Sequence, residues 1–111
     1  MKTRSAKNKG KRLQNDVRDL ILETFTELEP DDVRSTTMGD SGEDILLSPA
    51  ARKLFPFATE CKNQERLNLW EAYSQAESNC GDHQPIVFLK KNNHKPLVLV
   101  DADYFVKLHK D

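Results

Sequence analysis

Segments with two different hydrophobic periods alternate along this chain of 111 residues. The first segment has the period of a helix, because its apolar residues recur at helical spacing with no break before Pro30. Later segments are short runs of apolar or β-branched residues, which predict strands. These expected strands cover residues 33–37, 44–47, 57–62, 86–89 and 97–100. The pattern therefore predicts a fold in which short strands pack against helices.

Helix signals lie between these strands. Ser48, followed by a proline, predicts the N-cap of a short helix that ends before residue 56. Residues 65–78 have an amphipathic pattern that predicts a longer helix, with the aromatic rings of Trp70 and Tyr73 on its buried face. Stacking of these two rings on nucleic-acid bases is the alternative. The remaining segments are predicted turns, at residues 29–32, 38–42 and 90–95.

A last helix, capped by Asp101, completes the order α-β-β-short α-β-α-β-β-α. A chain of this length is expected to form one α/β (α+β) domain with a modest core. Residues 1–12 contain six Lys and Arg and no acid, whereas the whole chain has a net charge of −1. We therefore expect a basic N-terminal arm at residues 1–12 and a single domain at residues 13–111. Such an arm is typical of polyanion binding, and a solvated terminus is the alternative.

Several other classes of protein are not indicated. The two cysteines, Cys61 and Cys80, form no CxxC pair, so neither a zinc site nor a disulfide framework is expected. The three histidines have no metal-ligand spacing, and no phosphate-binding glycine loop is present. No apolar run approaches the roughly 18 residues of a membrane span, and no signal peptide is recognised. We expect a cytoplasmic protein without a membrane partner.

The strand expected at residues 57–62 places two charged side chains on one face. Because side chains alternate along a strand, Glu60 and Lys62 project the same way. Cys61 lies on the opposite face as a small apolar residue. Asp44, at the start of an earlier strand, completes a set of two carboxylates and one ammonium. Carboxylates bind hard divalent cations and a lysine assists the attack of water on phosphate, so the set indicates metal-dependent phosphodiester hydrolysis. A structural salt-bridge cluster is the alternative.

These residues resemble the D…ExK motif of the PD-(D/E)xK nuclease superfamily, with Gly42-Glu43-Asp44-Ile45 followed by Glu60-Cys61-Lys62. Within it, the chain is most similar to small Holliday-junction-resolvase-type nucleases of phages and archaea. The other similar segments are Lys9-Gly10-Lys11-Arg12, Arg34-Ser35 and Ser41-Gly42-Glu43-Asp44. The resemblance covers most of the chain and implies a restriction-endonuclease-like mixed β-sheet flanked by helices. If the protein is phage-encoded, its location would be the host cytoplasm.

The resemblance also implies an activity and its site residues. The activity is endonucleolytic hydrolysis of DNA, selective for branched structures, with Mg²⁺ as cofactor and Mn²⁺ as an expected substitute. The metal would be held by Asp44, Glu60 and the backbone carbonyl of Cys61. Lys62 would be the catalytic lysine.

Two positions depart from the family pattern. Glu43 stands where a turn-shaping proline often precedes the aspartate. Gln14 stands where the first helix of resolvase-type nucleases usually has a glutamate. We expect the neutral amide of Gln14 to act in the catalytic site, and a surface position without a role is the alternative.

DNA is the expected partner, contacted by basic and polar residues outside the carboxylate site. These residues are Lys7, Lys9, Lys11, Arg12, Arg34, Ser35, Lys90 and Lys91. For the last two, an exposed hairpin tip without a ligand is an equal alternative. A four-way junction has two symmetric cleavage sites, so a homodimer is expected. A catalytically silent DNA-binding module, or a sequence-specific restriction or homing nuclease of the same fold, are the alternative functions.

Overall fold

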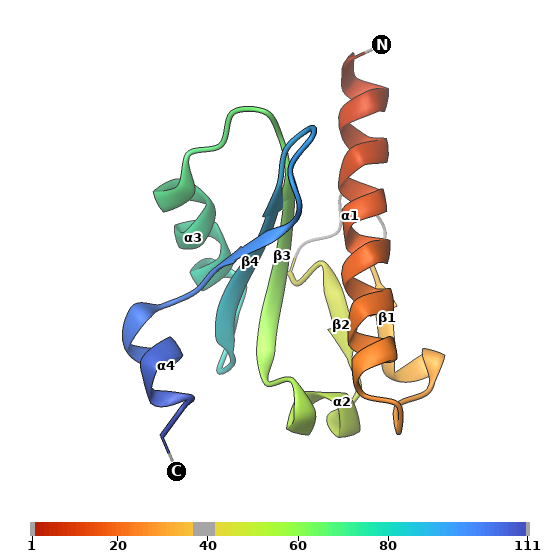
Figure 1. The fold of residues 1–111 in the computed structure, drawn as a ribbon, viewed down its shortest axis with the longest axis vertical. Helices are drawn as coiled ribbons and strands as arrows, with labels where there is room; N and C mark the ends of the chain where they lie inside the picture. The colour runs from red at the N-terminus through yellow and green to blue at the C-terminus, as the bar shows by residue number, and fades with distance from the viewer. Residues whose placement is uncertain (1, 37–41, 111) are drawn as a thin grey trace.

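A computed structural model describes residues 2–36 and 42–110, with side chains from residue 6 onward in these ranges. Its elements follow the predicted order (Figure 1). They are α1 (Lys2–Thr24), the 3-10 helix η1 (Pro30–Asp32), β1 (Val33–Ser35), β2 (Ile45–Leu47), α2 (Pro49–Leu54), β3 (Phe57–Asn63), α3 (Leu69–Ser78), β4 (Gln84–Lys90), β5 (Leu97–Leu99) and α4 (Ala102–Lys107). The predicted strand residue Thr37 and most of the predicted turn at 38–42 lie outside the described residues.

Within the described residues, the strands form two small sheets. β1 and β2 pair antiparallel, with Val33 opposite Leu47. In the larger sheet, β3 and β4 are parallel with α3 as their crossover, and β4 and β5 form an antiparallel hairpin. The larger sheet is therefore mixed, and the protein is a mixed α/β domain as predicted.

Two helices cover opposite faces of the larger sheet, and Figure 1 shows its strands between α1 and α3. Along β4, Ile86 and Phe88 pack into the core beneath α1, whereas Val87 packs against α3. The core beneath α1 also contains Leu13, Val17, Ile21, Val33, Ile45, Phe57 and Cys61. On the other face, the small side chains of Ala72 and Ala76 pack α3 against the sheet.

Capping residues decide where the shorter helices begin. Ser48 and Asp101 each accept a hydrogen bond from a backbone N–H in the first turn of α2 and α4, which confirms both predictions. The predicted start of α3 near residue 65 is wrong. Asn68 caps this helix by accepting a hydrogen bond from the backbone N–H of Glu71 (3.1 Å), so α3 begins immediately after Asn68.

Two further predictions about helices are wrong. The helical spacing that continues to Pro30 predicted a longer first helix, but α1 ends at Thr24, and Leu28 is buried from the turn that follows. Trp70 is 84 % exposed, although its place on an amphipathic helix predicted a core position. α3 meets the sheet through alanines, and Trp70 lies about 200° around the helix from Ala72. Tyr73 does pack against this core, as predicted.

The basic N-terminal segment is helical. α1 is continuous from Lys2 to Thr24, so the predicted boundary between residues 12 and 13 lies within one helix. From residue 6 onward, the side chains of this segment therefore project from a regular helix. Among the helices in the described part of the chain, none is both long enough and apolar enough to cross a lipid bilayer.

Candidate active site

Asp44 lies where the two sheets meet. Its backbone N–H donates to the carbonyl oxygen of Thr59 in β3 (2.8 Å), and its carbonyl oxygen accepts from the N–H of Thr36 (3.0 Å). Its side-chain Oδ2 accepts a hydrogen bond from the backbone N–H of Cys61 (2.7 Å). Asp44 is thus fixed from both sides, with its carboxylate against the edge of β3 that faces away from β4.

Cys61 presents its backbone to this site and its thiol to the core. The N–H and C=O of one strand residue point to the same side, so the Cys61 carbonyl lies on the edge where its N–H binds Asp44. The thiol packs beneath α1, and burial, aided by the charges of Asp44 and Glu60, raises its pKa. A thiol that stays protonated is no metal ligand, so the carbonyl is the group that Cys61 can offer.

Glu60 and Lys62 extend this site along β3. Glu60 is only 6 % exposed, and its Oε1 accepts a hydrogen bond from Nδ2 of Asn79 (2.9 Å), the C-cap of α3. Lys62 lines the same pocket as Glu60. Its ammonium is near enough to Asp44 and Glu60 to oppose, without outweighing, the effect of burial on the pKa of both carboxyl groups.

A pocket of about 390 Å³ brings the predicted site residues together. Its side chains come from α1, β3, α3 and the segment before β2, and include Gln14, Asp44, Glu60, Lys62, Gln75 and Asn79. All four residues predicted to act in catalysis therefore line one pocket. Gln14 is 3 % exposed, which is not the position of a surface residue.

Sequence reasoning missed part of this pocket. It did not assign Gln75, which is exposed at the mouth of the pocket, or Asn79 to the site. Gln75 in α3 and Asn79, the C-cap of this helix, are four residues apart, so the two amides lie on the same side of the helix end. An amide pair at this spacing, on the helix after the ExK strand, is the signal that could have identified them.

Glu43 also has a role that the sequence did not reveal. Its carboxylate accepts two hydrogen bonds from the guanidinium of Arg52 in α2, at 2.9 and 3.1 Å. Arg52 also donates to the carbonyl oxygen of Phe57 at the start of β3 (2.8 Å). This bidentate pair ties the segment before Asp44 to the strand that contains Glu60. It restrains the backbone at the position where the family pattern has a proline.

Burial raises the pKa of both carboxyl groups in the pocket. For Glu60, burial together with the charge of Asp44 outweighs the hydrogen bond from Asn79 and raises the pKa to about 7. For Asp44, burial outweighs the hydrogen bond from the Cys61 N–H and the charge of Lys62, so its pKa is also raised. A buried and a half-buried carboxylate, each with a raised pKa, are both stabilised in their ionised form by a cation bound between them.

The donors in this pocket fit Mg²⁺. Mg²⁺ is commonly held by one or two carboxylates and keeps several of its waters. Residues 2–36 and 42–110 contain no group of three or more His, Cys, Asp or Glu side chains arranged to hold a metal. The two carboxylates with the Cys61 carbonyl form an open oxygen site, which suits Mg²⁺ or Mn²⁺ better than zinc.

The predicted DNA-binding residues lie in two regions. Those exposed on α1 and β1 are Lys7, Arg12 and Arg34. Those in or beside the β4–β5 hairpin are Lys90 and Lys91. Two further lysines make internal contacts: Lys11 Nζ donates to Ser35 Oγ (3.0 Å), and Lys9 Nζ is 3.8 Å from the carboxylate of Glu65. If Lys11 or Ser35 contacts DNA, it must do so alongside the hydrogen bond that the two residues already form with each other. DNA contact by these residues stays a prediction.

Comparisons of the chain with protein-family models, with curated proteins and with solved structures found no match. What the site can do follows from its groups: two carboxylates, one ammonium and several amides around one open pocket.

Proposed function

We propose that the protein is a metal-dependent endodeoxyribonuclease that uses Mg²⁺ and selects branched DNA. The observation that supports this most is the meeting of Asp44, Glu60 and Lys62 in one pocket. In a structural cluster the lysine would be paired with a carboxylate. Within the part of the chain that the structure describes, Lys62 forms no salt bridge, which favours a site built around a further ligand.

Each group has a role in this proposal. Asp44, Glu60 and the Cys61 carbonyl would hold the metal. When bound, Mg²⁺ supplies Lewis-acid stabilisation of the charge on the scissile phosphate. Lys62 places a positive charge where it can orient the attacking water or stabilise the charge that develops on phosphate. The Gln14 amide would orient a water in the pocket, and in-line attack would leave a 3′-hydroxyl and a 5′-phosphate.

We also propose that the α/β arrangement is restriction-endonuclease-like. Two features support it. The aspartate that precedes β2 is bonded directly to β3, the strand that contains the ExK residues. The same strand continues through α3 into a parallel neighbour, with α1 on the opposite face (Figure 1).

The carboxylates of the site would repel the phosphates of DNA until a cation is bound between them. The basic half of α1 borders the pocket through Ala6 and Gly10, and would offset that repulsion by contacting flanking phosphates. A homodimer would match the two symmetric cleavage sites of a junction. Three apolar side chains that α4 and its C-cap leave at least half exposed, Phe105, Val106 and Leu108, offer a surface for such a dimer.

A cleavage panel tests the proposed function. Four-way, nicked, single-stranded and linear duplex DNA are incubated with the protein in Mg²⁺ and, separately, in EDTA. We expect cleavage in Mg²⁺ alone, fastest on branched DNA, with 5′-phosphate ends. Binding without cleavage of any substrate would instead establish a catalytically silent DNA-binding module. Cleavage of linear duplex at fixed sequences would establish a sequence-specific nuclease.

A further inference from the structure

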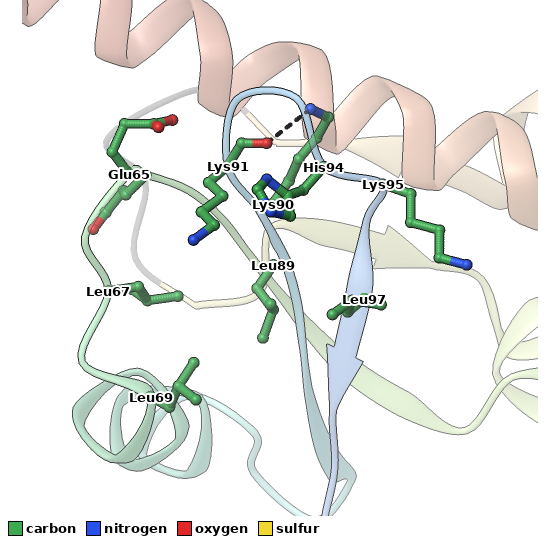
Figure 2. Close-up of a pocket in the computed structure, with 10 residues that line it drawn as sticks. Glu65, Leu67, Leu69, Leu89, Lys90, Lys91, His94, Lys95 and Leu97 are labelled. Atoms are coloured by element: carbon green, nitrogen blue, oxygen red, sulfur yellow. Dashed lines mark hydrogen bonds between the residues drawn. The ribbon is translucent and has the colours of Figure 1, made fainter.

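A second pocket, of about 230 Å³, lies between the β4–β5 hairpin and the segment that joins β3 to α3. Its apolar lining consists of four leucines. Figure 2 shows Leu67 and Leu69 on the α3 side, and Leu89 and Leu97 on the two strands of the hairpin. Leu69 and Leu97 are also large apolar side chains that are exposed. An open surface of this kind, left in contact with water, is suited to an apolar ligand group.

The rim of this leucine pocket is positively charged. Its basic residues are Lys90, Lys91, His94 and Lys95 (Figure 2). Glu65 is the acidic residue that lines it, and its carboxylate is already engaged: it accepts a hydrogen bond from the backbone N–H of Asn92 (2.6 Å) and faces Lys9 Nζ at 3.8 Å. A ligand for this pocket therefore combines a flat or compact apolar body with a negative charge.

The leucine pocket adjoins the candidate active site. Gln64 lines both pockets, and its backbone N–H donates to the carbonyl oxygen of Lys90 (3.0 Å), which fixes the wall between them. One strand of DNA that places a phosphate at Asp44 and Glu60 would therefore pass beside the leucines and the hairpin lysines.

We propose that the leucine pocket binds one unpaired nucleotide of the DNA substrate, with its base against the leucines and its phosphate at the lysine rim. The proposal rests on the proposed function, because the occupant is part of the same DNA. The volume is below the roughly 300–1,000 Å³ of sites for drug-sized ligands, which suits a single base. Taking a base out of a stack costs least where it is already unpaired. The pocket would thus make the protein prefer branch points, bulges and ends over continuous duplex.

The test uses the full chain in EDTA, so that no metal-dependent cleavage intervenes. The probe is a duplex with one unpaired 2-aminopurine nucleotide, compared with the fully paired duplex. A base that leaves the stack for leucines, which do not quench, becomes brighter. We expect the wild-type protein to brighten the unpaired base and to prefer this DNA about tenfold, equivalent to about 1.4 kcal/mol.

Two pairs of variants locate the effect. Leu97→Glu should abolish both the brightening and the preference, because a carboxylate in the pocket repels the phosphate. Val98→Glu is the matched control: Val98 is 48 % exposed against 55 % for Leu97, and both line a groove beside α1, but Val98 does not line the leucine pocket. Lys91→Ala, a change at an exposed residue, should lower the slope of log affinity against log salt by about one unit, whereas Lys53→Ala on α2 should not.

The outcomes separate this proposal from the proposed function. Brightening that depends on Leu97, in a protein that never cleaves DNA with Mg²⁺, would support the pocket and overturn the nuclease. Mg²⁺-dependent cleavage without brightening or preference would overturn the pocket alone. Equal effects of Leu97→Glu and Val98→Glu would overturn it too. A different ligand would also overturn it: the pocket would bind a fatty-acid carboxylate such as laurate, Leu97→Glu would abolish that binding, and the unpaired 2-aminopurine would not brighten.

Discussion

Replacing Glu60 by glutamine should stabilise the metal-free protein at pH 8. Burial raises the pKa of Glu60 from 4.5 to about 7. The folded protein therefore keeps a proton on Glu60 between these two pH values, whereas the unfolded chain has lost it. Stability falls as pH rises through this window and stays low above it, because the folded state binds more protons than the unfolded state. Glutamine cannot ionise, so the variant avoids this fall.

The magnitude follows from the size of the shift. Each pKa unit corresponds to about 1.4 kcal/mol, so Glu60→Gln should raise the free energy of unfolding at pH 8 by on the order of 3 kcal/mol. Near pH 4.5 the two proteins should differ little. The glutamine keeps an Oε1 atom that can accept the hydrogen bond from Asn79, so the packing around the site should be preserved.

Urea denaturation in EDTA at a series of pH values measures the effect. Glu77→Gln is the control, since Glu77 is an exposed acid on α3 outside the pocket, and this variant should not reproduce the gain in stability at pH 8. Added Mg²⁺ should stabilise the wild-type protein at pH 8 and less at pH 6, because protons compete with the metal, and should stabilise Glu60→Gln less at both. A Glu60→Gln profile parallel to that of the wild type, or a loss of stability at pH 8, would refute the reasoning.

Three other changes test the surroundings of the site. Deleting residues 1–8 removes three cations, so the slope of log DNA affinity against log salt should fall by roughly two to three units; an unchanged slope in anisotropy titrations would show that this end of α1 does not touch phosphate. Gln14→Ala should slow cleavage by about 10- to 100-fold, because a residue that orients a water is lost. Gln14→Glu should lower the Mg²⁺ concentration for half-maximal rate, because it adds a negative charge; identical metal titrations of the cleavage rate for the wild type and both variants would remove Gln14 from the site. Trp70→Ala should change the free energy of unfolding by less than about 0.5 kcal/mol, since the ring is exposed, and a loss above about 2 kcal/mol in urea would show that it is buried.

Local signals in the sequence predicted much of the fold and the strand that brings Glu60 and Lys62 to one pocket. Ser48 and Asp101 marked helix starts because a capping side chain acts on its own first turn. The alternation along β3 placed Glu60 and Lys62 together because side-chain direction in a strand is a property of the backbone. Predictions of this kind depend only on residues close in sequence. The structure confirms both helix caps and the strand β3.

The features that sequence reasoning missed depend on contacts between distant segments. Trp70 is exposed because tertiary packing selects the alanine face of α3, which helical periodicity alone does not choose. The hydrogen bond from Asn79 to Glu60 joins residues 19 positions apart, and it exists only once α3 has folded back on β3. The sequence showed Glu43 only as a residue that replaces a proline. Its ion pair with Arg52 was missed because Arg52 lies nine residues later, on the next helix.

The most direct test of the central claim is the rate of Mg²⁺-dependent cleavage of four-way-junction DNA by Asp44→Asn. The asparagine keeps an oxygen for the Cys61 N–H but removes a charge from the metal site, so cleavage should be abolished while the fold remains intact. DNA binding should persist or tighten, because a negative charge that would lie near phosphate is lost. Asp31→Asn, at an exposed position in η1, should cleave like the wild type. Cleavage by Asp44→Asn at the wild-type rate would contradict the account.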